Sequence, residues 1–295
     1  MSITKPPIIV IGGPTASGKT DCGKEIAQKY NGVVISADSR QVYRGLDIGT
    51  GKDATFHQEM IDIVSPGTPF TIADYVLRTN KVISAVYQAR KIPVCVGGTG
   101  YYIDAVLHNA SFPTAHNALY RQSLEHMPTM QLTKELHTVD PRSAIRVGHN
   151  RRRIIRALEI VYVTGKPVPV QCKKLRYDPL IIILDPGPDA LRARIASRLD
   201  SRLQSGMIQE VEHLRTYVDN HWLRNLGLEY KYISDYLDGI YTYEQMQLVL
   251  YTAICAYARR QRTWFRRYPD AQWITSPDEA YPLVDNFIKR YTISI

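Results

Sequence analysis

A phosphate-binding loop near the amino terminus limits the possible folds of this chain more than any other feature. Residues 13–20 read Gly-Pro-Thr-Ala-Ser-Gly-Lys-Thr, a complete G-x-x-x-x-G-K-[ST] pattern. A β-branched run at 8–11 precedes the loop, and residues 21–30 have the pattern of a helix that follows it. In that context backbone N–H groups surround phosphate oxygens, Lys19 adds a cation, and Thr20 is suited to hold Mg²⁺. The loop predicts a phosphate-bearing ligand and leaves the reaction open.

Short apolar runs predict a parallel sheet around this loop. Each run ends in glycine or in an acidic turn, and helix-length segments separate the first three: 8–12, 33–37, 92–97 and 180–184. Such runs are typical of buried strands in a doubly wound α/β fold. We therefore expect a P-loop NTPase-like core (1–110 and 178–295) with a parallel sheet, interrupted by a small helical insertion at 111–177. The chain after the fourth run is expected to be wholly helical.

Capping residues predict where several helices begin. Asn150 is expected to cap a helix of the insertion. Asp189 is expected to cap a helix of the core whose buried face carries Leu191, Ile195, Leu199 and Leu203. A long helix is expected from Tyr243 to about Arg267, with an arginine cluster at its end.

Composition excludes several classes of protein. The 295 residues are 44% hydrophobic, which suits a globular core. No stretch approaches the ~18 apolar residues that a membrane span needs. Residues 1–7 lead directly into the first strand, so we expect no signal peptide. The four cysteines lack C-x-x-C spacing, which favours reduced thiols in a cytoplasmic protein and no zinc site: Cys22, Cys95, Cys172 and Cys255.

Positive charge is concentrated in two places. The net charge is +9, and residues 110–176 alone hold twelve Lys and Arg against four Asp and Glu. A second group, between Arg259 and Arg267, has five arginines around Trp264 and Phe265. Basic surface beside aromatic side chains is typical of nucleic-acid binders. A solvated helix face on a basic protein has the same composition and stays an alternative.

Polar side chains follow two expected strands at their carboxyl ends, where open α/β sheets bind ligands. Asp38 follows the second strand, and its carboxylate is suited to act as a general base or to hold Mg²⁺ through water. An Asx-turn that closes the strand is the structural alternative. Arg40 and Gln41 can donate hydrogen bonds to the edge of a base. After the third strand, two glycines allow close approach of a ligand, and Thr99 offers a hydroxyl or serves as an N-cap.

The fourth strand ends in Asp185, as a Walker B strand does, which would favour phosphoryl transfer and a metal contact. Pro-Gly-Pro follows at once, and the pattern is weak by itself. No His, Cys and carboxylate cluster has the spacing of metal ligands, and there is no G-x-S-x-G elbow.

Taken together, these segments resemble the tRNA dimethylallyltransferase (tRNA isopentenyltransferase) family, in its bacterial form without a zinc finger. The resemblance is carried by 13–20, 38–50, 61–63, 96–99, 156–159 and 261–264. It implies transfer of a dimethylallyl group from dimethylallyl diphosphate to N6 of the adenosine that is 3′-adjacent to the anticodon. It also implies Mg²⁺ as cofactor, the tRNA anticodon stem-loop as partner, a helical tRNA-binding insertion, and no membrane or obligatory protein partner.

The resemblance also implies roles for individual residues. Asp38 is the expected base for the exocyclic amine, Thr99 the expected donor to a diphosphate oxygen, and Thr20 the expected Mg²⁺ ligand. The diphosphate-binding residues are Gly13, Pro14, Thr15, Ala16, Ser17, Gly18, Lys19, Thr20 and Arg224. The tRNA-binding residues are Asp38, Ser39, Arg40, Gln41, Thr99, Arg121, Arg152, Arg153 and Arg156. An aryl amine is a poor nucleophile, so a positioned base and a stabilised leaving group must both contribute.

The chain departs from the family pattern at several positions. Gln-Glu at 58–59 stands where paired histidines are usual, and Gly-His-Asn at 148–150 replaces a His-Pro-Asn-Asp stretch. The family stretch Gly-Tyr-[Arg/Lys]-[Gln/Glu] reads Gly-Leu-Glu-Tyr at 227–230. A basic contact to tRNA or diphosphate is therefore expected to be missing there, while the core chemistry is expected to survive.

Two other functions remain open from the residues. A prenyltransferase acting on free adenine nucleotides would use the same loop and base, but it would not need the basic insertion. A P-loop kinase for a nucleotide or small molecule would use the loop, Asp185 and three arginines, Arg192, Arg194 and Arg198. The kinase hypothesis leaves the segment 38–50 and the insertion unexplained.

Overall fold

The structure is a computed structural model that describes residues 5–108, 117–170 and 174–292. The chain forms two compact units, Met1–Asn109 with Lys174–Ile295 and Ala110–Lys173. The insertion therefore ends earlier than residue 177. The backbone N–H of Arg176 donates to the carbonyl of Leu107 at 2.8 Å, and Tyr177 is 2% exposed. This pairing with the end of a core helix assigns both residues to the first unit.

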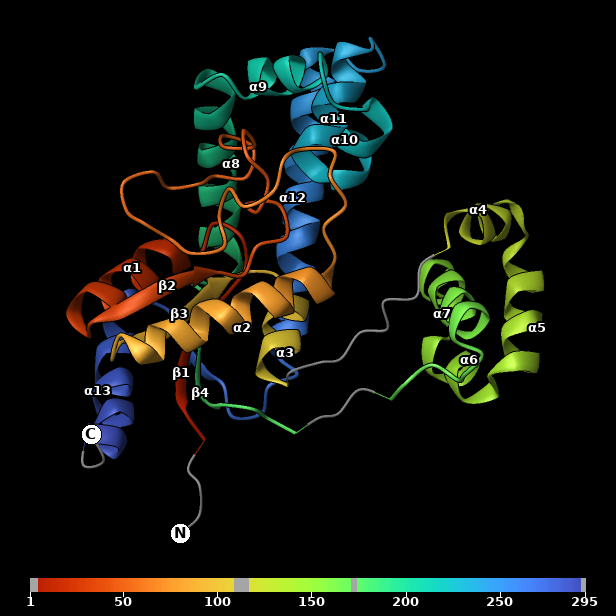
Figure 1. Ribbon diagram of the computed structural model, residues 1–295. Helices are drawn as coiled ribbons and strands as arrows, with labels where there is room; N and C mark the ends of the chain where they lie inside the picture. The colour runs from red at the N-terminus through yellow and green to blue at the C-terminus, as the bar shows by residue number, and fades with distance from the viewer. Residues whose placement is uncertain (1–4, 109–116, 171–173, 293–295) are drawn as a thin grey trace. The chain divides into compact units, whose positions relative to one another are not determined.

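The core is a five-stranded parallel sheet with the order β2-β3-β1-β4-β5 (Figure 1). Its strands are β1 (Pro7–Gly12), β2 (Gly32–Ser36), β3 (Ile92–Gly97), β4 (Asp178–Leu184) and β5 (Gln272–Ile274). The four expected strands are confirmed to within two residues. The expectation of a wholly helical region after β4 is wrong, because β5 pairs with β4 at the edge of the sheet. Three residues are too few to show the alternation by which a strand is recognised.

Helices cover both faces of the sheet. On one face, α1 (Lys19–Lys29) packs against Val94 and Val96 of β3, and α13 (Ala280–Thr292) packs against β4 and α1. Cys95 alternates to the other face. There α2 (Ile72–Gln88) contacts β3 and packs against α3 (Gly100–Leu107). Tyr75 of α2 donates its hydroxyl hydrogen to the carbonyl of Ser36 at 2.9 Å, which ties this helix to the end of β2.

A second hydrophobic core lies among the helices that follow β4. They are α8 (Pro188–Gln204), α9 (Met207–Leu214), α10 (Asn220–Leu226), α11 (Leu228–Leu237) and α12 (Tyr243–Phe265). The apolar face expected for α8 is buried, but Asp189 is not its cap. Gly187 is the N-cap and Pro188 occupies the first helical position, because the fixed φ of proline suits that position. A 3₁₀ turn, Pro277–Glu279, precedes α13.

The segment 37–71 connects β2 to α2 and has no regular helix or strand within this fully described stretch. Val42 and Leu46 are buried in the second core. Glu210 of α9 accepts the backbone N–H groups of Asp47, Ile48 and Gly49 at 2.8, 2.6 and 3.0 Å. Long connections of this kind commonly carry function.

The insertion unit has four helices in its described part, α4 (Ala118–His126), α5 (Thr129–Val139), α6 (Pro141–Val147) and α7 (Arg151–Thr164). Its core includes Leu132, Leu136 and Ile154. Asn150 caps α7 as predicted, because its side chain accepts the N–H of Arg153.

In the described ranges, no helix is long and apolar enough to cross a membrane. Cys22, Cys95 and Cys255 are free thiols, and Cys172 lies outside the described residues. Burial, with help from nearby Glu25, raises the pKa of Cys22 to about 12, which keeps this thiol protonated and unreactive.

Candidate active site

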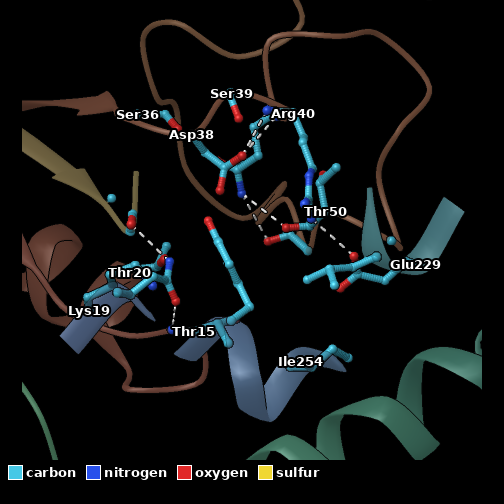
Figure 2. Close-up of a pocket in the computed structure, with 18 of the residues that line it drawn as sticks. Thr15, Lys19, Thr20, Ser36, Asp38, Ser39, Arg40, Thr50, Glu229 and Ile254 are labelled. Carbon is cyan, nitrogen blue, oxygen red and sulfur yellow. Dashed lines mark hydrogen bonds and ion pairs between the residues drawn. The ribbon is translucent and has the colours of Figure 1, made fainter. Parts of the chain in front are cut away.

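A pocket opens at the carboxyl ends of the parallel strands, bounded by the phosphate loop, the turn after β2, the end of β3, and helices α8, α11 and α12 (Figure 2). The charged side chains that line it are Lys19, Asp38, Arg40, Arg198, Arg202 and Glu229. Four cations against two carboxylates favour an anionic ligand. The pocket brings Asp38 and Lys19 into one site from two separate loops.

The phosphate loop forms one wall through Thr15, Lys19 and Thr20. Gly13 lies behind this wall, where a Cβ atom would come within 2.4 Å of the Leu184 carbonyl oxygen. Glycine is required at that position because the backbones of the loop and β4 are in contact. The remaining residues predicted to bind phosphate form the turn itself rather than the pocket lining: Gly13, Pro14, Ala16, Ser17 and Gly18.

Cations crowd the base of the loop. Burial, assisted by the nearby charge of Arg198, lowers the pKa of Lys19 to about 8. Burial also lowers the pKa of Arg198 to about 10, assisted by Arg202. Arg194 donates to the carbonyl of Ser17 at 3.0 Å, and Arg198 donates to the hydroxyl of Thr15 at 2.5 Å. These positive charges repel one another, and a multivalent anion bound between them would offset the repulsion.

The sequence predicts a role for Arg192, Arg194 and Arg198 only under the kinase hypothesis, and it predicts none for Arg202. Arg194 and Arg198 instead support the phosphate loop, and Arg202 lines the pocket. Arg192 pairs with Asp189 on the surface. The sequence signal for this role is the spacing of Arg194, Arg198 and Arg202, which lie four residues apart and therefore on one face of the helix.

Asp38 uses one carboxylate oxygen to close the turn after β2. Its Oδ1 accepts the backbone N–H groups of Arg40 at 2.8 Å and Gln41 at 3.4 Å, so the Asx-turn alternative is confirmed. The turn leaves the second oxygen available, because no donor in the described ranges bonds to Oδ2. Figure 2 shows that the carboxylate points toward the interior of the pocket.

The side chains that follow Asp38 bond within the protein. Gln41 accepts from the Ser36 hydroxyl at 2.7 Å and donates to the carbonyl of Thr50 at 3.4 Å. Arg40 donates to Glu229 at 3.2 Å, while Ser39 lines the pocket beside it. The side-chain donors of Arg40 and Gln41, which the sequence suggested for a nucleic-acid base, therefore bond to other groups of the protein.

Thr99 lies beside the pocket, just after the lining residues Gly97 and Gly98. It is the N-cap of α3, but its side chain makes no capping hydrogen bond. Tyr257 lines the pocket and interacts with both Thr99 and Asp38. Burial raises the pKa of Tyr257, and the charge of Asp38 raises it further.

Gln261 of α12 is 6% exposed and holds two walls of the pocket together. Its Oε1 accepts the N–H of Thr15 at 2.8 Å, and its Nε2 donates to the carbonyl of Gly98 at 2.9 Å. The sequence placed this residue in a family segment without a role. The sequence signal for a structural role is a glutamine on the expected apolar face of a long helix, because a polar group buried there needs hydrogen-bond partners.

Arg224 and Asp185 do not line this pocket. Arg224 forms ion pairs with Asp235 at 3.0 Å and with Asp238. Asp185 accepts from Arg262 at 2.5 Å, so its carboxylate is neutralised by a cation of α12. Across the described ranges, no three His, Cys, Asp or Glu side chains cluster as a metal site.

The arginines predicted to contact tRNA divide into two kinds. Arg156 and Arg121 pair with the buried carboxylate of Glu159 at 2.7 and 3.5 Å. Arg152 and Arg153 are exposed on the first turn of α7. A tRNA contact for any of the four stays a prediction, and the exposed pair is better suited to one.

Comparisons with known proteins agree with this architecture. The family model described as IPP transferase matches residues 41–268, and the model described as isopentenyl transferase matches residues 6–62. The chain belongs to the tRNA dimethylallyltransferase (IPP transferase) family. The tRNA dimethylallyltransferase of Pelotomaculum thermopropionicum is 37% identical over 287 residues, which cover 92% of this chain and 91% of that protein.

Solved structures of the family show the same fold. The full-length tRNA isopentenylpyrophosphate transferase of Bacillus halodurans superposes with a TM-score of 0.71 at 34% identity, covering 97% of this chain and 96% of that one. A eukaryotic dimethylallyltransferase, described as acting on tRNA, has a TM-score of 0.82 at 25% identity and covers 97% of this chain and 80% of its own.

Proposed function

We propose that the chain transfers a dimethylallyl group from dimethylallyl diphosphate to N6 of the adenosine that is 3′-adjacent to the tRNA anticodon. The observation that carries this proposal is the shared pocket of Asp38 and Lys19. A carboxylate oriented by a turn faces a group of partly buried cations there, as a base and an anionic leaving group require. Family membership supplies the substrate class.

The reaction exchanges one bond at C1 and moves one proton. The N6 atom attacks C1 of the dimethylallyl group, and the C1–O bond breaks so that diphosphate leaves with the electron pair. The N6 proton passes to Oδ2 of Asp38. A carboxylate can take this proton because the amine becomes strongly acidic only as its new bond forms.

The diphosphate is assigned to the phosphate loop. Lys19 supplies a charge, and backbone N–H groups of the loop surround the oxygens. Arg198 and Arg202 complete the cationic wall, and Thr99 donates to an oxygen of the leaving group. Arg224, engaged by Asp235 and Asp238, is assigned no contact.

Mg²⁺ fits the donor set. Mg²⁺ is typically held by one or two protein oxygens, by water and by substrate phosphates, and Thr20, which carries a hydroxyl, lines the pocket at the start of α1. When bound, the ion would offset charge on the diphosphate as the C1–O bond breaks.

The target adenosine must leave the stack of the anticodon loop to reach Asp38. We assign tRNA binding to the basic insertion, with Arg152 and Arg153 as phosphate contacts. Ser39 is assigned to the adenosine side of the pocket, and Arg40 and Gln41 support the turn. The tRNA substrate and the free thiols are in keeping with a cytoplasmic protein.

The test is an incubation with Mg²⁺, dimethylallyl diphosphate, and either unmodified tRNA or AMP, followed by mass spectrometry of the nucleosides. N6-dimethylallyl adenosine in tRNA alone is the expected result. Product on AMP alone would favour the free-nucleotide prenyltransferase. ATP-dependent phosphorylation without prenyl transfer would favour the kinase.

A further inference from the structure

Glu229 occupies a position between the two halves of the pocket. It lies in the first turn of α11, is 5% exposed and lines the pocket. Its Oε2 is 3.2 Å from Nη1 of Arg40, and its Oε1 is 3.8 Å from Nη1 of Arg202 (Figure 2 shows Arg40 and Glu229). One carboxylate therefore contacts a cation from the Asp38 turn and a cation from α8.

The contact with Arg40 holds the turn that carries Asp38. The guanidinium of Arg40 also donates through Nε to the carbonyl of Leu226 at 3.1 Å. A Cβ atom on Gly227 would lie 2.7 Å from Nη2, so the guanidinium rests against this backbone. The backbone N–H of the same arginine donates to Asp38 Oδ1 at 2.8 Å. Fixing the guanidinium on α11 thus limits the movement of Asp38.

The contact with Arg202 is looser. At 3.8 Å it is an ion pair without a hydrogen bond, and Nη1 donates instead to the carbonyl of Gly49 at 3.1 Å. The guanidinium lies against Gly51, where a Cβ atom would come within 1.7 Å of Nη2. Arg202 therefore keeps hydrogen-bonding capacity for an anion in the pocket.

We propose that Glu229 is a positioning residue that divides its charge between Arg40, which holds the Asp38 turn, and Arg202, which faces the diphosphate. The inference rests on the proposed function for the identity of the anion. Removing the charge of Glu229 raises the positive potential at the anion site. When Arg40 is removed, Glu229 pairs with Arg202 alone, and the potential at the anion site becomes less positive.

This division predicts opposite effects on anion affinity of two changes that each remove one charge. Glu229→Gln should bind inorganic pyrophosphate with Mg²⁺ about threefold to tenfold more tightly, and Arg40→Gln should bind it more weakly by a similar factor. Both should lower kcat for prenyl transfer. Arg40→Gln should lower it about tenfold or more because it releases the turn, whereas the amide oxygen in Glu229→Gln still accepts from Arg40. The double variant should return to near the wild-type affinity while kcat stays low.

Calorimetric titration with pyrophosphate and Mg²⁺ measures the affinities, and thermal melting reports folding. Glu212→Gln is the matched control, since it removes an exposed carboxylate from neighbouring α9. Weaker binding in both single variants, or no change in either, would overturn the inference. If the wild-type protein shows no prenyl transfer, the proposed function fails, whereas the opposite shifts in pyrophosphate affinity still decide the role of Glu229.

Discussion

The side-chain oxygen of Gln261 accepts the backbone N–H of Thr15 at 2.8 Å, although 246 residues separate the two. The amide nitrogen of the same side chain donates to Gly98 at 2.9 Å. One buried amide on α12 thus fixes the distance between the phosphate loop and the end of β3. Its two bonds join the wall assigned to the diphosphate to the wall that precedes Thr99.

Replacing this amide should loosen both walls. Gln261→Leu removes two hydrogen bonds and leaves the Thr15 N–H and the Gly98 carbonyl without partners, which costs about 1–3 kcal/mol of the free energy of unfolding. Pyrophosphate affinity should fall as well. Thermal or urea unfolding and a pyrophosphate titration measure the two effects. Gln247 is the control, because its side chain donates to Asp200 on the exposed side of the same helix. Gln247→Leu should change the free energy of unfolding by less than about 0.5 kcal/mol.

Diphosphate binding should take up a proton through Lys19. In the free protein burial lowers the pKa of this lysine to about 8, and an adjacent anion favours the charged form. Lys19 is therefore fully charged only well below pH 8, and its contribution to affinity is lost as pH rises above about 8 toward the higher pKa of the bound state. Calorimetry at pH 9 in buffers of different ionisation enthalpy should detect the uptake. Lys19→Gln should lack the uptake that is due to the lysine, and the ligand's own ionisation contributes equally in both proteins. Equal proton uptake by the wild type and Lys19→Gln would refute the assignment.

Asp38→Asn should stop prenyl transfer without disturbing the fold. The amide oxygen still accepts the Arg40 N–H, so the turn persists, but the side chain no longer takes a proton. We expect kcat to fall by about 10²–10⁴ and tRNA affinity to change by less than about twofold. Single-turnover kinetics and filter binding measure these quantities. Asp47→Asn, an exposed carboxylate of the same segment, is the control, and normal turnover in Asp38→Asn would exclude the general base.

The exposed arginines of α7 should contact tRNA phosphates. Replacing Arg152 and Arg153 with alanine should weaken tRNA binding and reduce the slope of log K against log salt by about one for each lost contact. Affinity measured over a range of salt concentrations gives the slope. Arg192→Ala, a surface arginine paired with Asp189, should leave it unchanged. A slope that is the same in the double variant would show that the two arginines are only a solvated helix face.

Asp185 should contribute to stability rather than to metal binding. Its carboxylate is 2.5 Å from Arg262 and accepts the Gly187 N–H at 3.1 Å. Asp185→Asn should therefore lower the free energy of unfolding by about 1–3 kcal/mol and leave Mg²⁺-dependent pyrophosphate binding intact. Unfolding and titration experiments separate the two. Loss of the Mg²⁺ dependence would restore the Walker B interpretation and, with it, the kinase hypothesis.

The sequence alone determined the sheet and the loop, because both depend on neighbouring residues. Apolar runs of strand length predicted four of the five strands, and the spacing of two glycines, Lys19 and Thr20 predicted the phosphate loop. The position of Asp38 followed from the rule that parallel strands end at one edge. The prediction was wrong where the local signal was weak. β5 has only three residues, and Gly187, Pro188 and Asp189 are neighbouring residues that each suit the start of α8.

The tertiary structure alone decided which side chains complete the site. Arg198, Arg202 and Gln261 reach the pocket from α8 and α12 only because those helices pack beside a loop from the first quarter of the chain. Packing likewise brings Glu229 to Arg40, so that an apparent loss of positive charge becomes an ion pair within the site. Local sequence carries the periodicity of an element, but contacts between distant segments depend on how whole elements bury their apolar faces against one another.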